Sequence, residues 1–181
     1  MRMNKKPNII LCGFMATGKS SVGRMLANRM RYEFLDMDAA IEKEEGVAIT
    51  QIFASRGEPA FRALETRMVE RLADVQGLII ATGGGTIVNP KNLERLKSCG
   101  VVVTLTADIP TILQRAGSGE DRPLLQAEDR VERIKSLLQQ RASAYAQADI
   151  VLDTSSLTIE EVAQQIIGRL KDLDFPLPAA D

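Results

Sequence analysis

The chain has 181 residues, of which 45% are hydrophobic and 26% charged, as is usual for one globular domain. Its 23 basic and 24 acidic residues leave a net charge of -1, so the surface as a whole should attract neither nucleic acid nor anionic lipid. The absence of histidine excludes a Ser-His-Asp triad and histidine metal ligands. No apolar run approaches the roughly 20 residues that span a bilayer. We therefore expect a cytoplasmic protein that binds neither nucleic acid nor a membrane.

Five short apolar runs alternate along the chain with longer segments of helical periodicity. Because the runs are continuously apolar, they are typical of strands covered on both faces. The alternation predicts βαβ units around a parallel sheet, in one α/β domain over residues 1–173 with a frayed tail over 174–181. The predicted strands are 8–12, 33–35, 78–81, 101–105 and 150–152, and the predicted helices are 19–30, 38–45, 58–75, 90–98, 109–115, 129–147 and 158–172.

The first predicted strand and helix are joined by Gly-Phe-Met-Ala-Thr-Gly-Lys-Ser at 13–20, a complete GxxxxGKS phosphate-binding loop. Glycines such as Gly13 and Gly18 let successive N–H groups point at phosphate oxygens, and the following helix adds the positive end of its dipole. Lys19 supplies charge to the outer phosphates, and the Ser20 hydroxyl is a ligand for Mg²⁺. The loop predicts binding of a nucleoside triphosphate. The chain has no Asn-Lys-x-Asp motif, which argues against a GTPase.

Two carboxylates, Asp36 and Asp38, stand where the second predicted strand ends, at the edge where parallel sheets bind ligands. Side chains two residues apart in an extended segment share a face, so we expect both to point into one cleft. One can hold Mg²⁺ through water while the other accepts a proton from a substrate hydroxyl. The alternative is that Asp38 caps the next helix.

An acidic residue, Glu65, falls on the apolar stripe of the helix predicted from residue 58, one turn after Phe61. An inward carboxylate needs a partner, and Arg62, three residues earlier, can supply it. Two interpretations stay open at this point. The two side chains form a structural ion pair, or Glu65 holds Arg62 toward a substrate carboxylate, which a guanidinium binds well.

Three consecutive glycines, Gly83, Gly84 and Gly85, follow the third predicted strand at the same edge. One glycine is normally enough for a tight turn between strand and helix. The run therefore favours close approach of a substrate to the backbone.

The helix predicted over 129–147 carries Arg141 where its periodicity calls for an apolar residue. No carboxylate lies four residues to either side, so we favour an anionic ligand for Arg141, with a buried ion pair to a distant residue as the alternative. The stripe consists of Val131, Ile134, Leu138, Arg141 and Tyr145.

Residues 116–128 are rich in glycine and charge and separate two predicted helices, where a loop of about five residues is usual. Gly117 and Gly119 stand at the base of the segment, and Arg122 precedes a proline in its middle. Such a segment can act as a lid over the site. An ordinary surface loop explains it equally well.

Together these residues resemble the bacterial shikimate kinase family, from residue 8 to about residue 170. The most specific part is Arg62 and Glu65 followed, after an apolar run, by Ala-Thr-Gly-Gly-Gly at 81–85. The resemblance implies a three-layer P-loop NTPase fold similar to that of nucleoside monophosphate kinases, with a five-stranded parallel sheet, helices on both faces and a mobile lid. It also implies a monomer that uses ATP and Mg²⁺ to phosphorylate the 3-hydroxyl of shikimate, a step of chorismate and aromatic amino-acid biosynthesis.

The resemblance implies roles for individual residues as well. Asp38 matches the group that grips the hydroxyls of shikimate and is the favoured base, and Asp36 matches the partner associated with Mg²⁺, beside Ser20. Arg122 matches a lid arginine over the phosphates, and Arg115 matches one that lies against adenine. The substrate carboxylate is assigned to Arg62, Arg141 and the glycines 83–85, ATP to Gly13, Ala16, Thr17, Gly18, Lys19, Ser20, Ser21, Arg115 and Arg122, and catalysis to Lys19, Asp38 and Arg122. In one departure from the family, Ala16 stands where many members have glycine.

Two rival interpretations remain. A sister kinase would phosphorylate gluconate or a nucleoside monophosphate, but two inward arginines beside Gly83–Gly85 favour a compact carboxylated polyol. A passive nucleotide-binding module would have no need of Lys19, Ser20 and both aspartates together.

Overall fold

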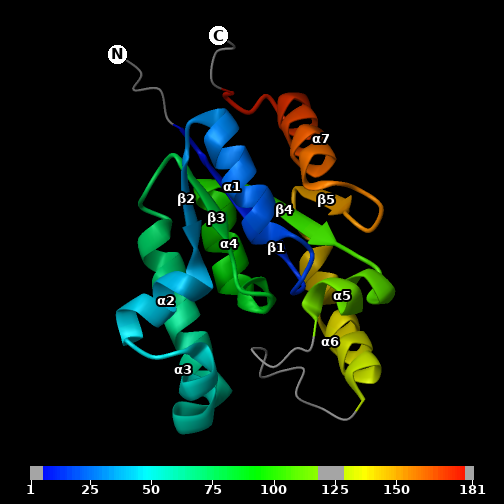
Figure 1. Ribbon diagram of the computed structural model, residues 1–181. Helices are drawn as coiled ribbons and strands as arrows, with labels where there is room; N and C mark the ends of the chain where they lie inside the picture. The colour runs from blue at the N-terminus through cyan, green and yellow to red at the C-terminus, as the bar shows by residue number, and fades with distance from the viewer. Residues whose placement is uncertain (1–5, 118–128, 178–181) are drawn as a thin grey trace.

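The computed structural model describes residues 6–117 and 129–177. A five-stranded sheet forms its centre, and its order, β2-β3-β1-β4-β5, has every pair of neighbours parallel. All five carboxyl ends therefore meet at one edge, the lower edge in Figure 1. The strands are β1 (Asn8–Gly13), β2 (Glu33–Asp36), β3 (Leu78–Ala81), β4 (Gly100–Thr106) and β5 (Ile150–Asp153).

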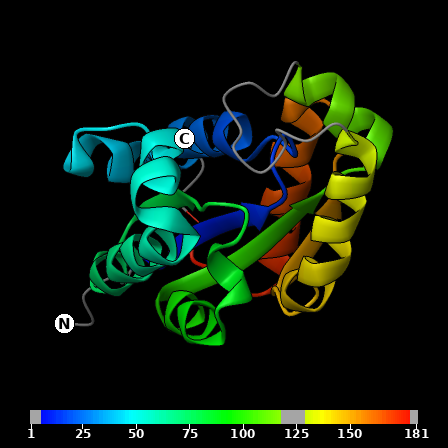
Figure 2. The ribbon, with the colours of Figure 1, turned by 90° about the horizontal axis from the view of Figure 1, so that it is seen from below.

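Helices cover both faces of the sheet, so the molecule has three layers (Figure 2). Ile9 and Leu11 of β1 pack into the layer of α1 and α7, whereas Ile10 and Cys12 pack into the layer of α3, α4 and α6. Burial on both faces explains the apolar runs of the inner strands β1 and β3, which are buried at every position, whereas the edge strands β2 and β5 have exposed positions. The helices are α1 (Lys19–Met30), α2 (Met37–Glu45), α3 (Ile49–Leu72), α4 (Pro90–Cys99), α5 (Ile109–Ala116), α6 (Arg130–Tyr145) and α7 (Ile159–Asp172), and a short 3₁₀ turn η1 spans Thr86–Val88.

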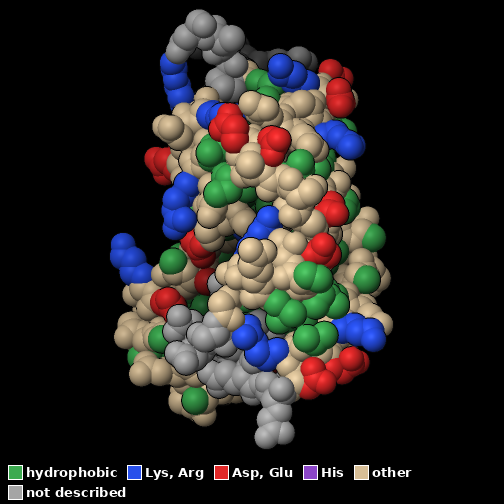
Figure 3. Space-filling model, turned by 45° about the vertical axis from the view of Figure 1, so that its right-hand side comes forward, with side chains coloured by type: hydrophobic (Ala, Val, Ile, Leu, Met, Phe, Trp, Pro, Cys, Tyr) green, Lys and Arg blue, Asp and Glu red, His purple; other side chains and the backbone are tan. Residues whose placement is uncertain are grey.

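The surface fits the nearly neutral composition. In the view of Figure 3, basic and acidic side chains are interspersed rather than gathered into a patch of one sign. Within residues 6–117 and 129–177, no helix combines the length and the apolar character needed to cross a membrane.

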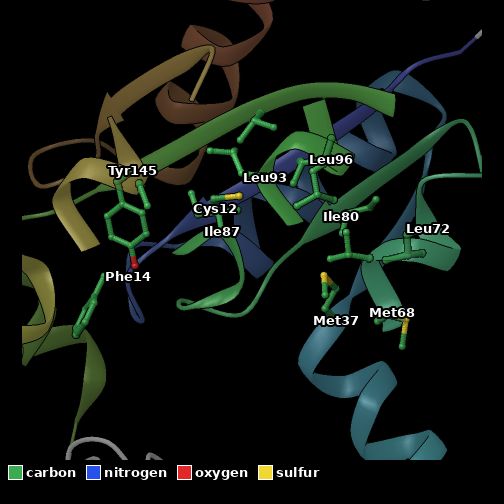
Figure 4. Close-up of a cluster of buried hydrophobic side chains, with 14 of the residues drawn as sticks. Cys12, Phe14, Met37, Met68, Leu72, Ile80, Ile87, Leu93, Leu96 and Tyr145 are labelled. Atoms are coloured by element: carbon green, nitrogen blue, oxygen red, sulfur yellow. The ribbon is translucent and has the colours of Figure 1, made fainter. Parts of the chain in front are cut away.

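The larger of the two apolar clusters extends from α2 and α3 to α6. Figure 4 shows Met37, Met68 and Leu72 at one end of this cluster, and Phe14 and Tyr145 at the other. Phe14 belongs to the phosphate-binding loop, so the core reaches the candidate site at this end.

Helix α3 differs most from its prediction. It starts at Ile49 rather than at residue 58, and it contains a break at Gly57, whose φ of 78° and ψ of 168° are not helical. The predicted helix is therefore the second part of α3, where Pro59 stands in the first turn, a position that tolerates proline. The first part was missed because it is less than three turns long, too short for its apolar residues Ile49, Ile52 and Phe53 to stand out as a helical stripe.

The prediction of a frayed tail from residue 174 is wrong at its start. Phe175 is buried among residues of α1 and α7, and its N–H donates to the carbonyl of Leu170. The free energy gained by burying the aromatic ring exceeds the conformational entropy cost of ordering the chain end. Residues 178–181 lie outside the described part of the chain.

Candidate active site

A cavity of about 490 Å³ opens at the carboxyl edge of the sheet. In the view of Figure 2, α2 and α3 lie on one side of this edge and α5 and α6 on the other. Three predicted site residues, Gly13, Thr17 and Arg115, are described but do not line the cavity, and Arg122, with the predicted lid over 118–128, lies outside the described residues. The predicted residues that line it are Ala16, Gly18, Lys19, Ser20, Ser21, Asp36, Asp38, Arg62, Gly83, Gly84, Gly85 and Arg141.

The phosphate-binding loop leaves β1 through a tight turn. Gly13 has a φ of 131°, and a Cβ there would lie 2.1 Å from the carbonyl oxygen of Leu105, so only glycine fits this position. Gly18 has a φ of 97° and precedes α1 without a side-chain cap. The first N–H groups of α1 are therefore left for an anion.

Lys19 lies over the loop. Its Nζ donates to the carbonyl oxygens of Gly13 at 3.0 Å and Phe14 at 2.8 Å. The Thr17 hydroxyl also donates to the Phe14 carbonyl, at 2.8 Å. These bonds hold the ammonium at the mouth of the loop, where a phosphate would meet it.

Ala16 has a left-handed backbone with a φ of 61°. A β-carbon is disfavoured in this region, where glycine has no such penalty. The conformation gives a physical reason for the glycine that many family members have at this position. The loop therefore contains local strain at Ala16.

Asp36 and Asp38 do not share an extended segment, which corrects the prediction. Strand β2 ends at Asp36, and Asp38 lies in the first turn of α2. The cap is Asp36, whose Oδ1 accepts from the N–H groups of Asp38 at 3.1 Å and Ala39 at 3.3 Å. The alternative in which Asp38 caps the helix is therefore wrong. Both carboxylates still line the cavity, because the helix starts at once and turns Asp38 toward it.

The second oxygen of Asp36 faces the phosphate-binding loop. The Ser20 hydroxyl donates to Asp36 Oδ2 at 2.6 Å, so the two predicted Mg²⁺ residues are adjacent. The described residues contain no cluster of three or more potential metal-ligating Cys, Asp or Glu side chains. Mg²⁺ in phosphoryl-transfer sites takes one or two protein oxygens, and water and phosphate supply the rest. The pair of Ser20 and Asp36 fits that requirement.

Arg62 is held by two carboxylates. Its Nη1 donates to Glu65 at 2.6 Å, and its Nε and Nη2 donate to Glu58 at 3.1 and 2.8 Å. Glu65 is 1% exposed and Glu58 is 49% exposed. Burial lowers the pKa of the Arg62 guanidinium, but the two carboxylates, Glu65 foremost, outweigh it and raise that pKa above its usual value.

Glu65 has a second partner that the sequence did not indicate. The Thr86 hydroxyl donates to Glu65 Oε1 at 2.5 Å, and Asn92 Nδ2 donates to the Thr86 carbonyl oxygen at 3.0 Å. Arg62 therefore forms the ion pair with Glu65 and also lines the cavity. The two interpretations of Arg62, a structural ion pair and a substrate-binding group, do not exclude each other. A chain of buried hydrogen bonds fixes Glu65, and Glu65 in turn fixes Arg62.

The three glycines make room for side chains of the protein itself. A Cβ at Gly85 would lie 2.6 Å from Arg62 Nη1, and one at Gly84 would lie 3.1 Å from Arg141 Nη1. A Cβ at Gly83 would lie 2.4 Å from a Glu65 oxygen. Each glycine thus faces a different charged side chain of the cavity, a reason for the run that the sequence alone did not suggest.

Arg141 is turned inward, as predicted. It is 5% exposed, and its guanidinium lies 5.6 Å from the Phe14 ring centroid. No carboxylate of the described residues is within ion-pair distance of it, so the alternative of a buried ion pair gains no support there. The predicted stripe is wrong at Val131, which is 47% exposed, and the buried positions of α6 are Ile134, Leu137, Arg141, Ala144 and Tyr145.

Arg115 is anchored beside the phosphate-binding loop. It donates to the Thr154 hydroxyl at 3.0 Å and to the Thr154 carbonyl at 2.8 Å. The Thr154 hydroxyl donates to the carbonyl of Thr17 at 3.1 Å. Thr154, which the sequence reasoning missed, joins the end of β5 to the loop and to α5.

The family model for shikimate kinase matches residues 15–171 of this sequence. The chain belongs to the shikimate kinase family. The shikimate kinase of Geobacter metallireducens is 44% identical over 164 residues, which cover 91% of this chain and 92% of that protein. A structure of the Acinetobacter baumannii shikimate kinase in complex with shikimate superposes with a TM-score of 0.90 at 37% identity, covering 94% of this chain and 96% of the other.

Membership of the shikimate kinase family confirms the predicted enzyme class, a kinase with an alcohol acceptor. The fold prediction is confirmed too, since a five-stranded parallel sheet with helices on both faces is present. The thymidylate kinase of Candida albicans matches with a TM-score of 0.58 at 13% identity, over 98% of this chain and 96% of that one. That likeness concerns the fold alone.

Proposed function

We propose that this member of the shikimate kinase family transfers the γ-phosphoryl group of ATP to the 3-hydroxyl of shikimate, giving shikimate 3-phosphate and ADP. The observation that carries the proposal is that one cavity contains a phosphate-binding loop and two arginines, Arg62 and Arg141. A loop of this kind suits the triphosphate of ATP, and the arginines suit a carboxylate.

The arginines bind the carboxylate of shikimate. Glu58 and Glu65 together occupy the Nε, Nη1 and Nη2 atoms of Arg62 with one hydrogen bond each, so each Nη keeps a further N–H for a ligand. Arg141 brings a positive charge that no carboxylate of the described residues neutralises. Shikimate is thereby oriented with its ring toward Asp38, which hydrogen-bonds its hydroxyls.

The phosphoryl transfer needs alignment more than covalent chemistry. The bond between the γ-phosphorus and the oxygen bridging to the β-phosphate breaks as the bond to the shikimate oxygen forms. Lys19 stabilises the charge on the phosphates, and Asp38 accepts the proton that the 3-hydroxyl loses. Arg122 is assigned the same electrostatic role by the family resemblance and belongs to the proposal on that ground.

Mg²⁺ when bound neutralises phosphate charge and orients the phosphates. Ser20 and Asp36 are the residues that would hold it. Because Asp36 also caps α2, its replacement should disturb the start of that helix as well as the metal.

We further propose that the chain is a single P-loop domain that extends to Phe175, two residues beyond the predicted boundary. We also propose that residues 116–128 act as its lid, and that the protein works as a cytoplasmic monomer without nucleic-acid or membrane partners. The interspersed surface charges of Figure 3 support the last point. Sedimentation of the purified chain tests the monomer, since a dimer would roughly double the measured mass.

The function is tested by following ADP formation with Mg²⁺-ATP and four conditions: shikimate, gluconate, AMP and no acceptor. We expect turnover with shikimate alone. Turnover with another acceptor would contradict the assigned substrate but keep the phosphate-binding loop. Bound ATP without turnover under any condition would point to a passive nucleotide-binding module.

A further inference from the structure

The two arginines of the cavity come from different helices and are separated by the glycine loop. Arg62 belongs to α3 and lies against Gly85, whereas Arg141 belongs to α6 and lies against Gly84. The loop therefore acts as the spacer between the two guanidinium groups. A carboxylate that binds both needs this spacing to be constant within fractions of an ångström.

A tyrosine of α6 is bonded to this spacer. The Tyr145 hydroxyl donates to the Gly84 carbonyl oxygen at 2.6 Å, across 61 residues of sequence. Tyr145 is 5% exposed and one helical turn from Arg141. Burial raises the pKa of the Tyr145 hydroxyl, and the nearby Arg141 opposes this only in part, so the hydroxyl remains a proton donor at neutral pH.

We propose that Tyr145 is a positioning residue for substrate binding: its bond to Gly84 sets the distance between Arg141 and the glycine loop. Arg62 lies against the other side of that loop, so the bond also sets the distance between the two arginines. The proposal rests on the proposed function, because it takes the two arginines as the binding site of the substrate carboxylate. Tyr145 does not line the cavity and acts through Gly84 and Arg141.

Loss of this hydroxyl has a defined consequence. The Gly84 carbonyl would be left without its tyrosine donor, and it would have to shift to find another. A shift of Gly84 moves the atom that Arg141 lies against. Gly84 also lies close to the phosphate-binding loop, since a Cβ there would be 3.4 Å from the Gly13 carbonyl oxygen. That loop is held by its own bonds from Lys19 and Thr17, so we expect a smaller effect on ATP than on shikimate.

The chain offers a matched control, because it has only two tyrosines. The hydroxyl of Tyr32 is buried but has no hydrogen-bond partner among the described residues. Tyr32 belongs to the apolar cluster on the other face of the sheet. The variants Tyr145→Phe and Tyr32→Phe both remove a tyrosine hydroxyl oxygen. In Tyr145 this atom is bonded to the glycine loop, whereas in Tyr32 it has no hydrogen bond within the described residues.

The experiment measures steady-state kinetics and thermal unfolding for both variants. For Tyr145→Phe we expect the KM for shikimate to rise about fivefold, while kcat and the KM for ATP stay within about twofold. Tyr32→Phe should leave all three constants unchanged. Equal KM values for shikimate in the two variants would overturn the proposal, as would a parallel loss of shikimate and ATP affinity in Tyr145→Phe.

A double variant tests the route through Arg141. If Tyr145 acts by placing Arg141, the effect of Tyr145→Phe should shrink severalfold on an Arg141→Lys background. Full additivity of the two effects would contradict that route. Turnover of shikimate by the unmodified chain separates the two proposals. If the unmodified chain does not turn over shikimate, both the proposed function and this inference are overturned. If it does, but Tyr145→Phe leaves the KM for shikimate unchanged, this inference alone is overturned.

Discussion

The phosphate-loop half of the cavity, residues 13–21, is shaped by the backbone of one continuous segment. The arginine half, which comprises Arg62, Gly83–Gly85 and Arg141, is assembled from two helices and a loop. In the first half the bonds of Lys19 and Thr17 to the loop carbonyls join residues up to six positions apart; bonds to Asp36 and Thr154 then attach the loop to the rest of the fold. In the second they join Thr86 to Glu65, and Tyr145 to Gly84, across 21 and 61 residues.

This difference determines how each half can fail. A continuous loop depends on which φ and ψ angles its residues can adopt, so strain at a single position is decisive. The arginine half depends on distant side chains meeting in a buried network, where each missing partner leaves another group unsatisfied. Substitutions in one half should therefore alter one substrate and spare the other.

The largest effect should come from Lys19→Met. Loss of the ammonium over the loop removes charge stabilisation from the phosphates, and we expect kcat/KM to fall about a thousandfold. Lys91→Met, on the exposed side of α4, is the control and should behave like the unmodified chain. Near-native turnover of Lys19→Met would show that the loop does not act on the phosphates.

Arg62→Ala should break the arginine half alone. Two charged hydrogen bonds to the substrate are lost, so we expect the KM for shikimate to rise about a hundredfold while ATP binding, measured by calorimetry, survives. Arg71→Ala serves as control. Arg71 lies on the same helix as Arg62, and its replacement removes only a surface ion pair with Glu44. Equal loss of both affinities in a folded Arg62→Ala protein would instead support a purely structural ion pair.

Gly85→Ala sharpens the comparison, because it moves Arg62 without removing it. The new Cβ would come within 2.7 Å of three guanidinium atoms, so Arg62 must shift, and we expect about a tenfold rise in the KM for shikimate. Gly168→Ala in α7 meets nothing within 4 Å and should be neutral or slightly stabilising. A KM unchanged by Gly85→Ala would mean that Arg62 can bind its ligand from a different position.

Ala16→Gly should give the smallest effect, and it is confined to the phosphate-loop half. Glycine relieves the left-handed strain at this position, so the free energy of unfolding in urea should rise by about 1 kcal/mol. The same exchange at Ala63, an exposed helical position of α3, should lower it by about 1 kcal/mol. A decrease at both positions would show that the strain at Ala16 is negligible.

Much of the fold could be predicted because its causes are local. The alternation of apolar runs and helical stripes predicted all five strands within one or two residues of their observed ends, and α1 at its observed bounds. The phosphate-binding loop is one segment, so its motif contains its geometry. Arg141 was recognised because a charged residue on an apolar stripe has few physical explanations.

What sequence reasoning missed depends on partners far away in the chain. Glu65 binds Thr86 across 21 residues, and Phe175 is ordered because α1 and α7 leave a place for its ring. The cap of α2 is a local exception: Asp36 rather than Asp38 caps the helix because α2 starts at Met37, one residue earlier than predicted.

The sequence by itself determined the α/β class, the phosphate-binding loop and the residue types of the cavity, since these follow from periodicity and from a contiguous motif. Only the tertiary structure decided which distant groups meet: that Glu65 also binds Thr86, that each glycine faces a charged side chain, and that Tyr145 reaches Gly84. Such pairings arise when packing brings separate elements together, and no spacing along the chain encodes the distance between them.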